Sequence, residues 1–292
     1  MLKRRQLLLG GLGLAGASIP ATWSYSHKEA DSLSLETLKV PIRGLERPLR
    51  LAQLSDIHWD DGPTVRWSLI EDAIEQIRLA KADLVVLTGD YVTFDPEPIS
   101  ALAPYLGQIP SRLGIYAVLG NHDNCTPTSN RTITTAFKKA NIEVLENTWT
   151  DVGGIALAGT GDFWTGPYEP RQIFTELRNR KPTVLLAHNP DSFWQLAEQR
   201  VDLQLSGHTH GGQVRLPFLG PLLAWRSRLN HYLPELSRAI PRGEAITRTG
   251  SWEGEYRKGD NHLYVSRGLG RFRRLSIGCP PEVTIIDLIP KA

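Results

Sequence analysis

After residue 48 the sequence shows one pattern five times: a short apolar run that ends abruptly in polar residues. The runs are mostly Leu, Val and Ile, which is typical of buried strands. Each polar cluster is therefore expected in a loop at the carboxyl end of a strand, where α/β proteins carry their binding groups. The five segments are LRLAQLSDIH (49–58), DLVVLTGD (83–90), GIYAVLGNHD (114–123), PTVLLAHNPD (182–191) and VDLQLSGHTH (201–210).

The stretches between these runs predict helices. Residues 64–82 carry large apolar side chains at helical spacing, and further helices are expected around 171–180 and 191–199. LETLKVPI (35–42) is expected to be an entry strand. Strands alternating with helices predict an α/β fold with a largely β core. The apolar positions of the first helix are Trp67, Ile70, Ile74 and Ile77.

The polar clusters together form a set of nitrogen and oxygen donors without a thiolate. Such a set is typical of a site for borderline divalent metals such as Mn, Fe or Zn, and not of a thiolate zinc site. It is large enough for two ions that share a carboxylate. Each residue alone has an ordinary explanation, such as a turn former or a hydrogen-bonded histidine. Their joint occurrence in order, each at a strand end, favours one common site. The residues are Asp56, His58, Asp90, Asn121, His122, Asp123, His188, His208 and His210.

The order D-x-H, G-D, G-N-H-D, a lone His after a strand and G-H-x-H resembles the signature of the calcineurin-like metallophosphoesterases. The resemblance is closer to the exported phosphodiesterases of the YaeI/YkuE type. It implies a four-layer α-β-β-α sandwich in which two mixed β-sheets are flanked by helices. The segments that carry the closer resemblance are SDIH, TGDYV, GNHDN, GTGDFW (159–164), LAHNPD, GHTHGGQ, SRGLG (266–270) and PPEVTIIDL (280–288).

The resemblance also implies two divalent metal ions per chain, of Mn, Zn or Fe. It places one ion on Asp56, His58 and His210 and the other on Asn121, His188 and His208, with Asp90 bridging them. Alternate residues of an extended segment share a face, so His208 and His210 are expected to serve one ion each. Gly207, Gly211 and Gly212 are expected to let the backbone bend closely around the site.

Two ions of this kind lower the pKa of a water between them and bind the phosphate oxygens, so that hydroxide attacks phosphorus in line. His122 is then the candidate proton donor or charge stabiliser for the leaving alkoxide. Asp123 is interpreted as the residue that orients or charges this imidazole, with a loop cap as the alternative.

Three further residues are candidates for substrate contact. Arg267 in SRGLG suits a bidentate contact to a phosphate, and a surface salt bridge is the alternative. Asp162 and Trp164 in GTGDFW are expected to line the entrance, and ordinary packing is the alternative for Trp164.

The N-terminus predicts export. Lys3, Arg4 and Arg5 precede an apolar segment rich in Leu, Gly and Ala, so residues 1–27 are interpreted as a twin-arginine-type signal or anchor. A plain secretory signal and an uncleaved anchor remain open. This interpretation makes the twin-arginine machinery a partner and the periplasm or cell envelope the destination. It also leaves peripheral membrane contact open.

Residues 28–292 are expected to form one metallophosphoesterase domain, in which 214–250 is unconventional. It contains the apolar stretch LPFLGPLLAW followed by several arginines. One hypothesis is a cap that accepts a lipid tail, and the alternative is a surface insertion.

The predicted function is hydrolysis of a phosphoester, favouring a diester and including lipid- or wall-linked substrates. Two alternatives remain: a pyrophosphatase acting on a nucleotide-linked lipid precursor of the UDP-diacylglucosamine type, and a non-catalytic, metal-dependent envelope binding protein. The net charge of +2 argues against a dedicated nucleic-acid binder. Cys125 and Cys279 are too few for a disulfide framework.

Overall fold

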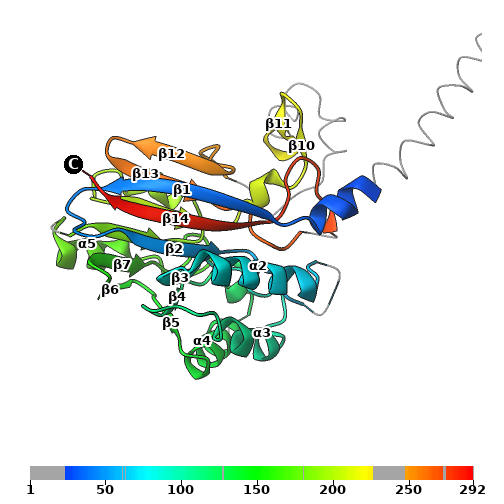
Figure 1. Cartoon of the computed structure of the whole chain (residues 1–292), viewed down its shortest axis with the longest axis horizontal. Helices are drawn as coiled ribbons and strands as arrows, with labels where there is room; N and C mark the ends of the chain where they lie inside the picture. Colours follow the sequence, from blue (N-terminus) through cyan, green and yellow to red (C-terminus); the bar gives the residue numbers. More distant parts are fainter. Residues whose placement is uncertain are drawn as a thin grey trace, which may run out of the picture.

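The computed structural model describes residues 24–60, 62, 64–126, 128–179, 181–225, 247–271 and 274–291. Two six-stranded sheets lie face to face, and helices cover their outer faces (Figure 1). The predicted four-layer α-β-β-α architecture is confirmed. Residues 1–23 of the predicted signal segment lie outside the described residues. Residues 226–246 of the predicted insertion also lie outside them.

The first sheet is mixed and has the strand order β1-β14-β2-β3-β4-β5. Its centre is the parallel run from β2 to β5, and β14 is antiparallel to β2. The predicted entry strand is confirmed as the edge strand β1, which pairs in parallel with β14. The strands are β1 (Ser34–Ile42), β14 (Glu282–Pro290), β2 (Leu49–Leu54), β3 (Leu84–Leu87), β4 (Ile115–Ala117) and β5 (Ile142–Val144).

The second sheet is also mixed, with the order β12-β13-β9-β8-β7-β6. Its four central strands are parallel, and each edge strand is antiparallel to its neighbour. The strands are β12 (Gly254–Lys258), β13 (Asn261–Val265), β9 (Leu203–Ser206), β8 (Thr183–Leu186), β7 (Ile155–Gly159) and β6 (Thr148–Val152).

The helices lie on opposite sides of the sheet pair. Three pack on the first sheet, and two short ones pack with the second. The predicted helices exist, although the one expected over 191–199 is a single turn. None of the helices in the described ranges combines the length and the hydrophobicity needed to cross a membrane. The helices are α2 (Trp67–Ala80), α3 (Ile99–Leu106), α4 (Ser129–Lys139), α5 (Pro170–Leu177) and α6 (Ser192–Gln195).

The core between the sheets follows the two-residue period of a strand. In β3, Leu84 and Val86 face the second sheet, whereas Val85 and Leu87 face the helices. All four side chains are fully buried. This two-sided burial explains why the strands read as unbroken apolar runs in the sequence.

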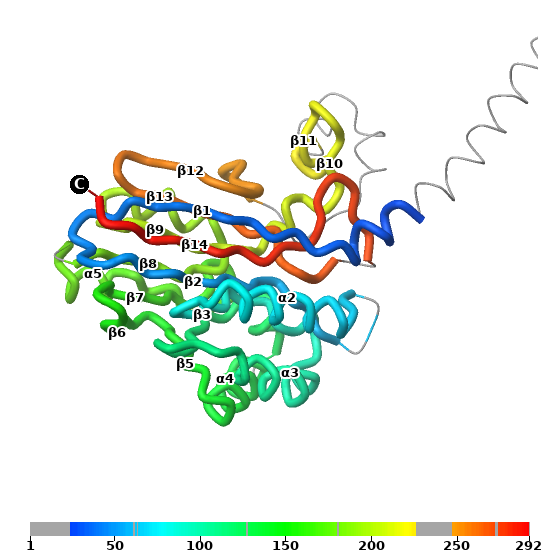
Figure 2. The backbone as a smooth tube through the Cα atoms, in the orientation of Figure 1, coloured from blue at the N-terminus to red at the C-terminus, as the bar shows by residue number. Residues whose placement is uncertain are grey.

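Two peripheral pieces lie at one end of the molecule (Figure 2). Residues 24–30 are helical, and Ser26 is buried although the sequence assigned it to the export segment. A small hairpin of β10 (Arg215–Leu216) and β11 (Gly220–Pro221) begins the predicted insertion. The end of the insertion is held by Asp191, which accepts hydrogen bonds from Thr247 Oγ1 at 2.6 Å and Arg248 N at 2.8 Å.

Candidate metal centre

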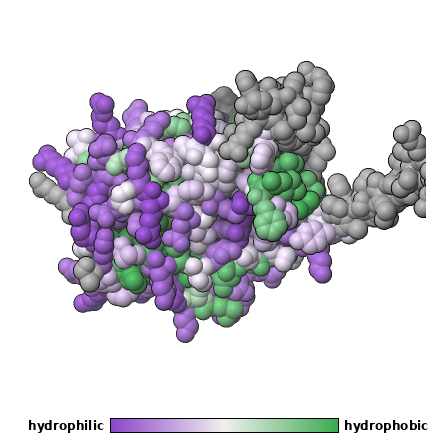
Figure 3. Space-filling view, turned by 90° about the horizontal axis from the view of Figure 1, so that it is seen from above, coloured by the Kyte–Doolittle hydropathy of each residue, from purple (hydrophilic) through white to green (hydrophobic). Residues whose placement is uncertain are grey.

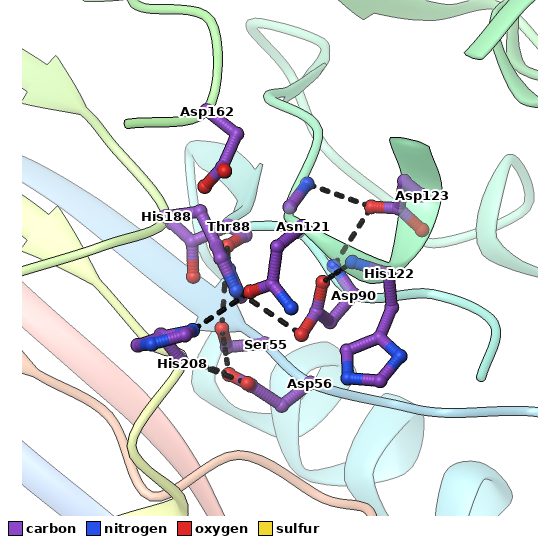
Figure 4. Close-up of polar contacts among 12 residues, drawn as sticks. Ser55, Asp56, Thr88, Asp90, Asn121, His122, Asp123, Asp162, His188 and His208 are labelled. Carbon is purple, nitrogen blue, oxygen red and sulfur yellow. Dashed lines mark hydrogen bonds and ion pairs between the residues drawn. The ribbon is translucent and has the colours of Figure 1, made fainter. Parts of the chain in front are cut away.

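The predicted site residues lie at one edge of the sheet pair, where the carboxyl ends of β2, β3, β4, β8 and β9 meet. Gln53 shows how the sheets are joined there, because its Nε2 donates to Thr88 Oγ1 of the first sheet and to the Ser206 carbonyl of the second, each at 3.0 Å. Figure 4 shows Asp90, Asn121 and His208 directed toward one another at this edge.

One group of candidate ligands surrounds Asp56. Asp56, His58 and His210 place their nitrogen and oxygen atoms within 4.8 Å of one another. His58 Nε2 lies 3.1 Å from His210 Nε2, and His210 Nε2 lies 3.6 Å from Asp56 Oδ1. These are the residues that the resemblance assigns to the first ion.

A second group surrounds Asp90 and contains His188 and His208. Asp90 Oδ2 lies 3.1 Å from His188 Nε2, and the amide of Asn121 joins the group through Oδ1, 2.8 Å from His208 Nδ1. The same Asp90 oxygen lies 3.6 Å from His58 Nε2 of the first group. Asp90 therefore touches both groups, as a bridging carboxylate must.

The donor set fits two divalent cations. His188 Nδ1 lies 2.7 Å from the Thr88 carbonyl and His210 Nδ1 lies 3.0 Å from the Gly270 carbonyl, so each ring donates backward and presents Nε2 to the centre. Metal-binding histidines are held in this way by a partner on their second nitrogen. Burial lowers the pKa of His58 to about 3, which keeps that ring neutral and able to ligate.

The charges of the centre depend on one another. Burial raises the pKa of Asp56 to about 6, and the neighbouring Asp90 adds to this effect. Burial would also raise the pKa of Asp90, but the His188 imidazole holds it well below its ordinary value. Asp90 in turn raises the pKa of His188 against the effect of burial. Metal ligands must give up their protons, so a divalent cation held by Asp90 and His188 would replace the proton on this imidazole.

The backbone of the centre is unusual. Asp56, His58, Asp90, His208 and His210 all have positive φ, from 47° to 71°. This region is uncommon for residues other than glycine and costs roughly 1–3 kcal/mol per residue. The prediction that His208 and His210 alternate along an extended segment is therefore wrong. Each has a left-handed backbone, and this turn places one histidine in each group.

Glycines let the two sheets approach at the centre. A Cβ on Gly207 would lie 2.0 Å from Asp56 Oδ2, and one on Gly120 would lie 2.2 Å from Asp90 Oδ1. Asp56 is fixed in this narrow space by Ser55 Oγ at 2.5 Å and by the His208 N–H at 2.9 Å. Only glycine at these positions leaves room for the two carboxylates.

His122 and Asp123 have different surroundings. His122 is close enough to His58 and Asp90 to join a ligand group, and its Nδ1 lies 2.5 Å from the Thr93 carbonyl. Asp123 instead accepts hydrogen bonds from backbone N–H groups, including Asp90 N at 2.8 Å and Tyr91 N at 2.9 Å. Thr93 orients the His122 ring, and the contacts of Asp123 are those of the loop cap named as its alternative. An effect of Asp123 on His122 stays a prediction.

Aromatic side chains flank the centre. Trp164 lies edge-on to His208, with ring centroids 4.6 Å apart, and Asp162 beside it is buried. Asp162 Oδ1 accepts hydrogen bonds from its own loop, including Trp164 N at 2.9 Å. Phe94, which the sequence did not single out, is exposed and lies 5.6 Å from the His122 ring. In the sequence, only its position two residues after the strand-end motif TGDYV could have indicated that Phe94 lies near the centre.

Arg267 is not brought to the centre. Its guanidinium pairs with Glu36, with Glu282 at 2.9 Å and with Glu253 at 3.8 Å. These pairs match the salt bridge that was the alternative for this residue. The substrate role of Arg267 stays a prediction. The neighbouring Arg271 was missed: it is fully buried, and its Nη1 donates at 2.7 Å to the Gly270 carbonyl that also holds His210.

The cysteines do not form a disulfide. Cys125 is exposed, whereas Cys279 is buried behind the centre, with its Sγ 3.1 Å from the His210 carbonyl. Among the described residues, neither sulfur belongs to a group of candidate ligands.

Comparison with known proteins agrees with this geometry. The chain is 34% identical to the phosphodiesterase YaeI of Escherichia coli over 83% of each chain. It is 30% identical to the metallophosphoesterase YkuE of Bacillus subtilis over 98% of each. It is 27% identical to the UDP-2,3-diacylglucosamine pyrophosphatase LpxG of Chlamydia muridarum, over 91% of this chain and 92% of that protein. The family described as Calcineurin-like phosphoesterase matches residues 49–212, and the chain belongs to this family of hydrolases.

Proposed function

We propose that this chain hydrolyses a phosphodiester at the centre around Asp90. The position of Asp90 carries the proposal, because one carboxylate oxygen lies 3.1 Å from His188 Nε2 and 3.6 Å from His58 Nε2. Two divalent cations held by the two groups would supply activation of a water and neutralisation of the phosphate charge. The similarity to YaeI, which is named a phosphodiesterase, supports a diester substrate.

His122 is the residue proposed to protonate the leaving alkoxide. Its ring is fixed on one side by the Thr93 carbonyl at Nδ1, and its centroid lies 4.8 Å from that of His58. This arrangement holds the other ring nitrogen in one position beside the first ligand group. A positioned general acid contributes about 10²- to 10⁴-fold to the rate.

Turnover of bis-p-nitrophenyl phosphate tests the proposal. The protein is stripped with a chelator and reloaded separately with Mn, Zn or Fe, and p-nitrophenyl phosphate serves as the monoester comparison. We expect diester hydrolysis that disappears with chelation and returns with at least one metal. A fully metal-loaded protein that cleaves neither ester would refute the proposal.

A second candidate is a pyrophosphatase that acts on UDP-2,3-diacylglucosamine. The similarity to LpxG over nearly the whole length of both chains favours it. Both reactions break a phosphoryl–oxygen bond, so the same centre suits either. Release of UMP from UDP-2,3-diacylglucosamine faster than from a water-soluble diester would favour this candidate, and the reverse order would favour the first.

Export to the cell envelope by the twin-arginine route is also proposed, because only Gln6 separates Arg4 and Arg5 from an apolar segment. Cell fractionation tests it. Replacing both residues by lysine keeps the charge and should retain the protein in the cytoplasm, whereas unchanged export would indicate a plain secretory signal.

A further inference from the structure

The β10–β11 hairpin presents a cluster of apolar side chains to solvent. Phe218 is 108% exposed, Leu219 53% and Leu216 37%, so three of the eight exposed large hydrophobic side chains in the described ranges fall within four residues. Figure 3 shows an apolar patch in the part of the surface where Figure 1 places this hairpin. Single exposed hydrophobic residues are ordinary, but a cluster of them marks an interaction surface.

The hairpin is held on the domain by its base. Arg215 N donates to the Ile277 carbonyl at 2.7 Å, and Leu222 N donates to the Val214 carbonyl at 2.9 Å. Phe218 has a φ of 64°, a left-handed backbone that is strained for a bulky side chain. The turn is closed by Leu219 N, which donates to the Leu216 carbonyl at 3.1 Å, and it leaves the Phe218 ring fully exposed.

The chain enters the domain beside this hairpin. The loop that contains Ile277 also binds the first described helix, because Ser276 N donates to Ser26 Oγ at 2.9 Å and Ser276 Oγ donates to Glu29 Oε2 at 3.0 Å. On the same helix, Tyr25 is 55% exposed and Lys28 is exposed. In the sequence this helix follows an apolar segment with a basic head, which is the predicted signal or anchor.

We propose that the hairpin tip, formed by Leu216, Phe218 and Leu219, inserts into the interfacial region of a lipid bilayer. An aromatic and two leucines on a rigid turn suit that region, and Tyr25 and Lys28 on the adjacent helix suit its interface and an anionic headgroup. The occupant is a lipid surface because, in the sequence, an apolar segment directly precedes the helix of residues 24–30, which packs on the same loop as the hairpin.

Docking of this kind brings the metal centre to the membrane, an inference that rests on the proposed function. The hairpin begins five residues after His210, and Arg215 Nη1 donates to the Gly211 carbonyl at 3.2 Å. Gly212 lies against the hairpin base, since a Cβ there would be 2.5 Å from Pro221 Cβ. A lipid-linked phosphoester then reaches the centre without leaving the bilayer surface.

Hydrogen exchange of the full-length chain tests the proposal, measured with and without vesicles of phosphatidylcholine and phosphatidylglycerol. We expect the amides of residues 214–222 to exchange about tenfold more slowly with vesicles, because insertion removes them from water. The amides of the β12–β13 hairpin should not change. The F218S/L219S variant should lose the slowing, whereas L35S/L79S, which removes exposed leucines on β1 and α2, should keep it.

Two results would overturn the proposal. One is unchanged exchange of residues 214–222 on vesicles that do bind the chain. The other is equal protection without vesicles, which would mean that another segment of this chain or a second copy covers the tip. Turnover of bis-p-nitrophenyl phosphate in solution is expected to be the same in F218S/L219S and the wild type. Failure of turnover in both would count against the proposed hydrolysis and not against docking.

Discussion

The interior between the sheets and the edge that carries the metal centre are built by different rules. In the interior, strands such as β3 send alternate apolar side chains to opposite faces, and burial of these side chains drives folding. At the edge, buried carboxylates and imidazoles face one another, and five of the residues that carry them have left-handed backbones. Apolar burial in the interior offsets the free-energy cost of the strained backbone at the edge.

The comparison shows why the two regions respond differently to substitution. A change in the interior removes apolar contacts and lowers the free energy of unfolding, but leaves the geometry of a folded molecule intact. A change at the edge removes charge balance or ligand geometry, and therefore acts on metal binding and turnover. Four sets of substitutions test this division.

The largest effect is expected from Asp90→Ala. Removing the carboxylate that touches both histidine groups should lose both ions and reduce turnover to background, because the group of His188 and His208 then has no carboxylate and the other group keeps only Asp56. Elemental analysis and diester hydrolysis measure the two losses. Asp287→Ala is the matched control: this aspartate pairs with Arg50 on the surface, and its loss should change neither. If Asp90→Ala kept both ions, Asp90 would not be the residue that bridges them.

His122→Ala should keep its ions and lose about 10²- to 10⁴-fold in turnover, the contribution of a positioned general acid. Asp123→Ala sharpens the contrast between these adjacent residues. Since Asp123 holds the N–H groups of Asp90 and Gly120, its loss should lower metal content as well. If His122→Ala lost its ions, the histidine would be a ligand and not the proton donor.

Gly207→Ala should weaken metal binding about 10- to 100-fold, the usual effect of disturbing the residues that support a ligand. The added methyl would lie 2.0 Å from Asp56 Oδ2 and from Ser55 Oγ, so the carboxylate must shift from its position beside His58 and His210. Metal titration against a competing chelator measures the change. Gly254→Ala serves as the control: its φ of 78° strains the alanine as well, but nothing lies within 4 Å of the added Cβ, so its metal affinity should not change. Unchanged affinity in Gly207→Ala would show that the edge is less tightly packed than described.

Leu288→Ala, in the interior, should have the smallest effect on chemistry. Leu288 is fully buried between the sheets on β14, a strand that carries none of the ligands. Its truncation should cost about 2–5 kcal/mol of unfolding free energy. Turnover per folded molecule should not change. A large loss of turnover at full metal content would contradict the division between interior and edge.

The sequence predicted the interior well and the edge in part. Alternating burial leaves a local pattern, so the strands and their order along the chain were readable from runs such as DLVVLTGD. The ligand residues were readable from their motifs, since each follows a strand directly. The contacts between them were not, because Asp56 and His208 are separated by 152 positions and meet only through the packing of the two sheets.

One error and one open assignment at the edge have a common physical cause. Left-handed φ at an aspartate or histidine leaves no mark in the sequence, so His208 and His210 were assigned an extended backbone that they do not have. Likewise, the sequence does not distinguish a carboxylate that contacts side chains from one that accepts hydrogen bonds from backbone N–H groups, so both roles stayed open for Asp123. Arg271 and Phe94 were missed because neither belongs to a ligand motif.

Anomalous diffraction from crystals of the manganese-loaded protein tests the central claim most directly. We expect two peaks about 3.5–4 Å apart, one beside His58 and His210 and the other beside His188 and His208, with Asp90 between them. A single peak, or two peaks that Asp90 does not join, would contradict the account.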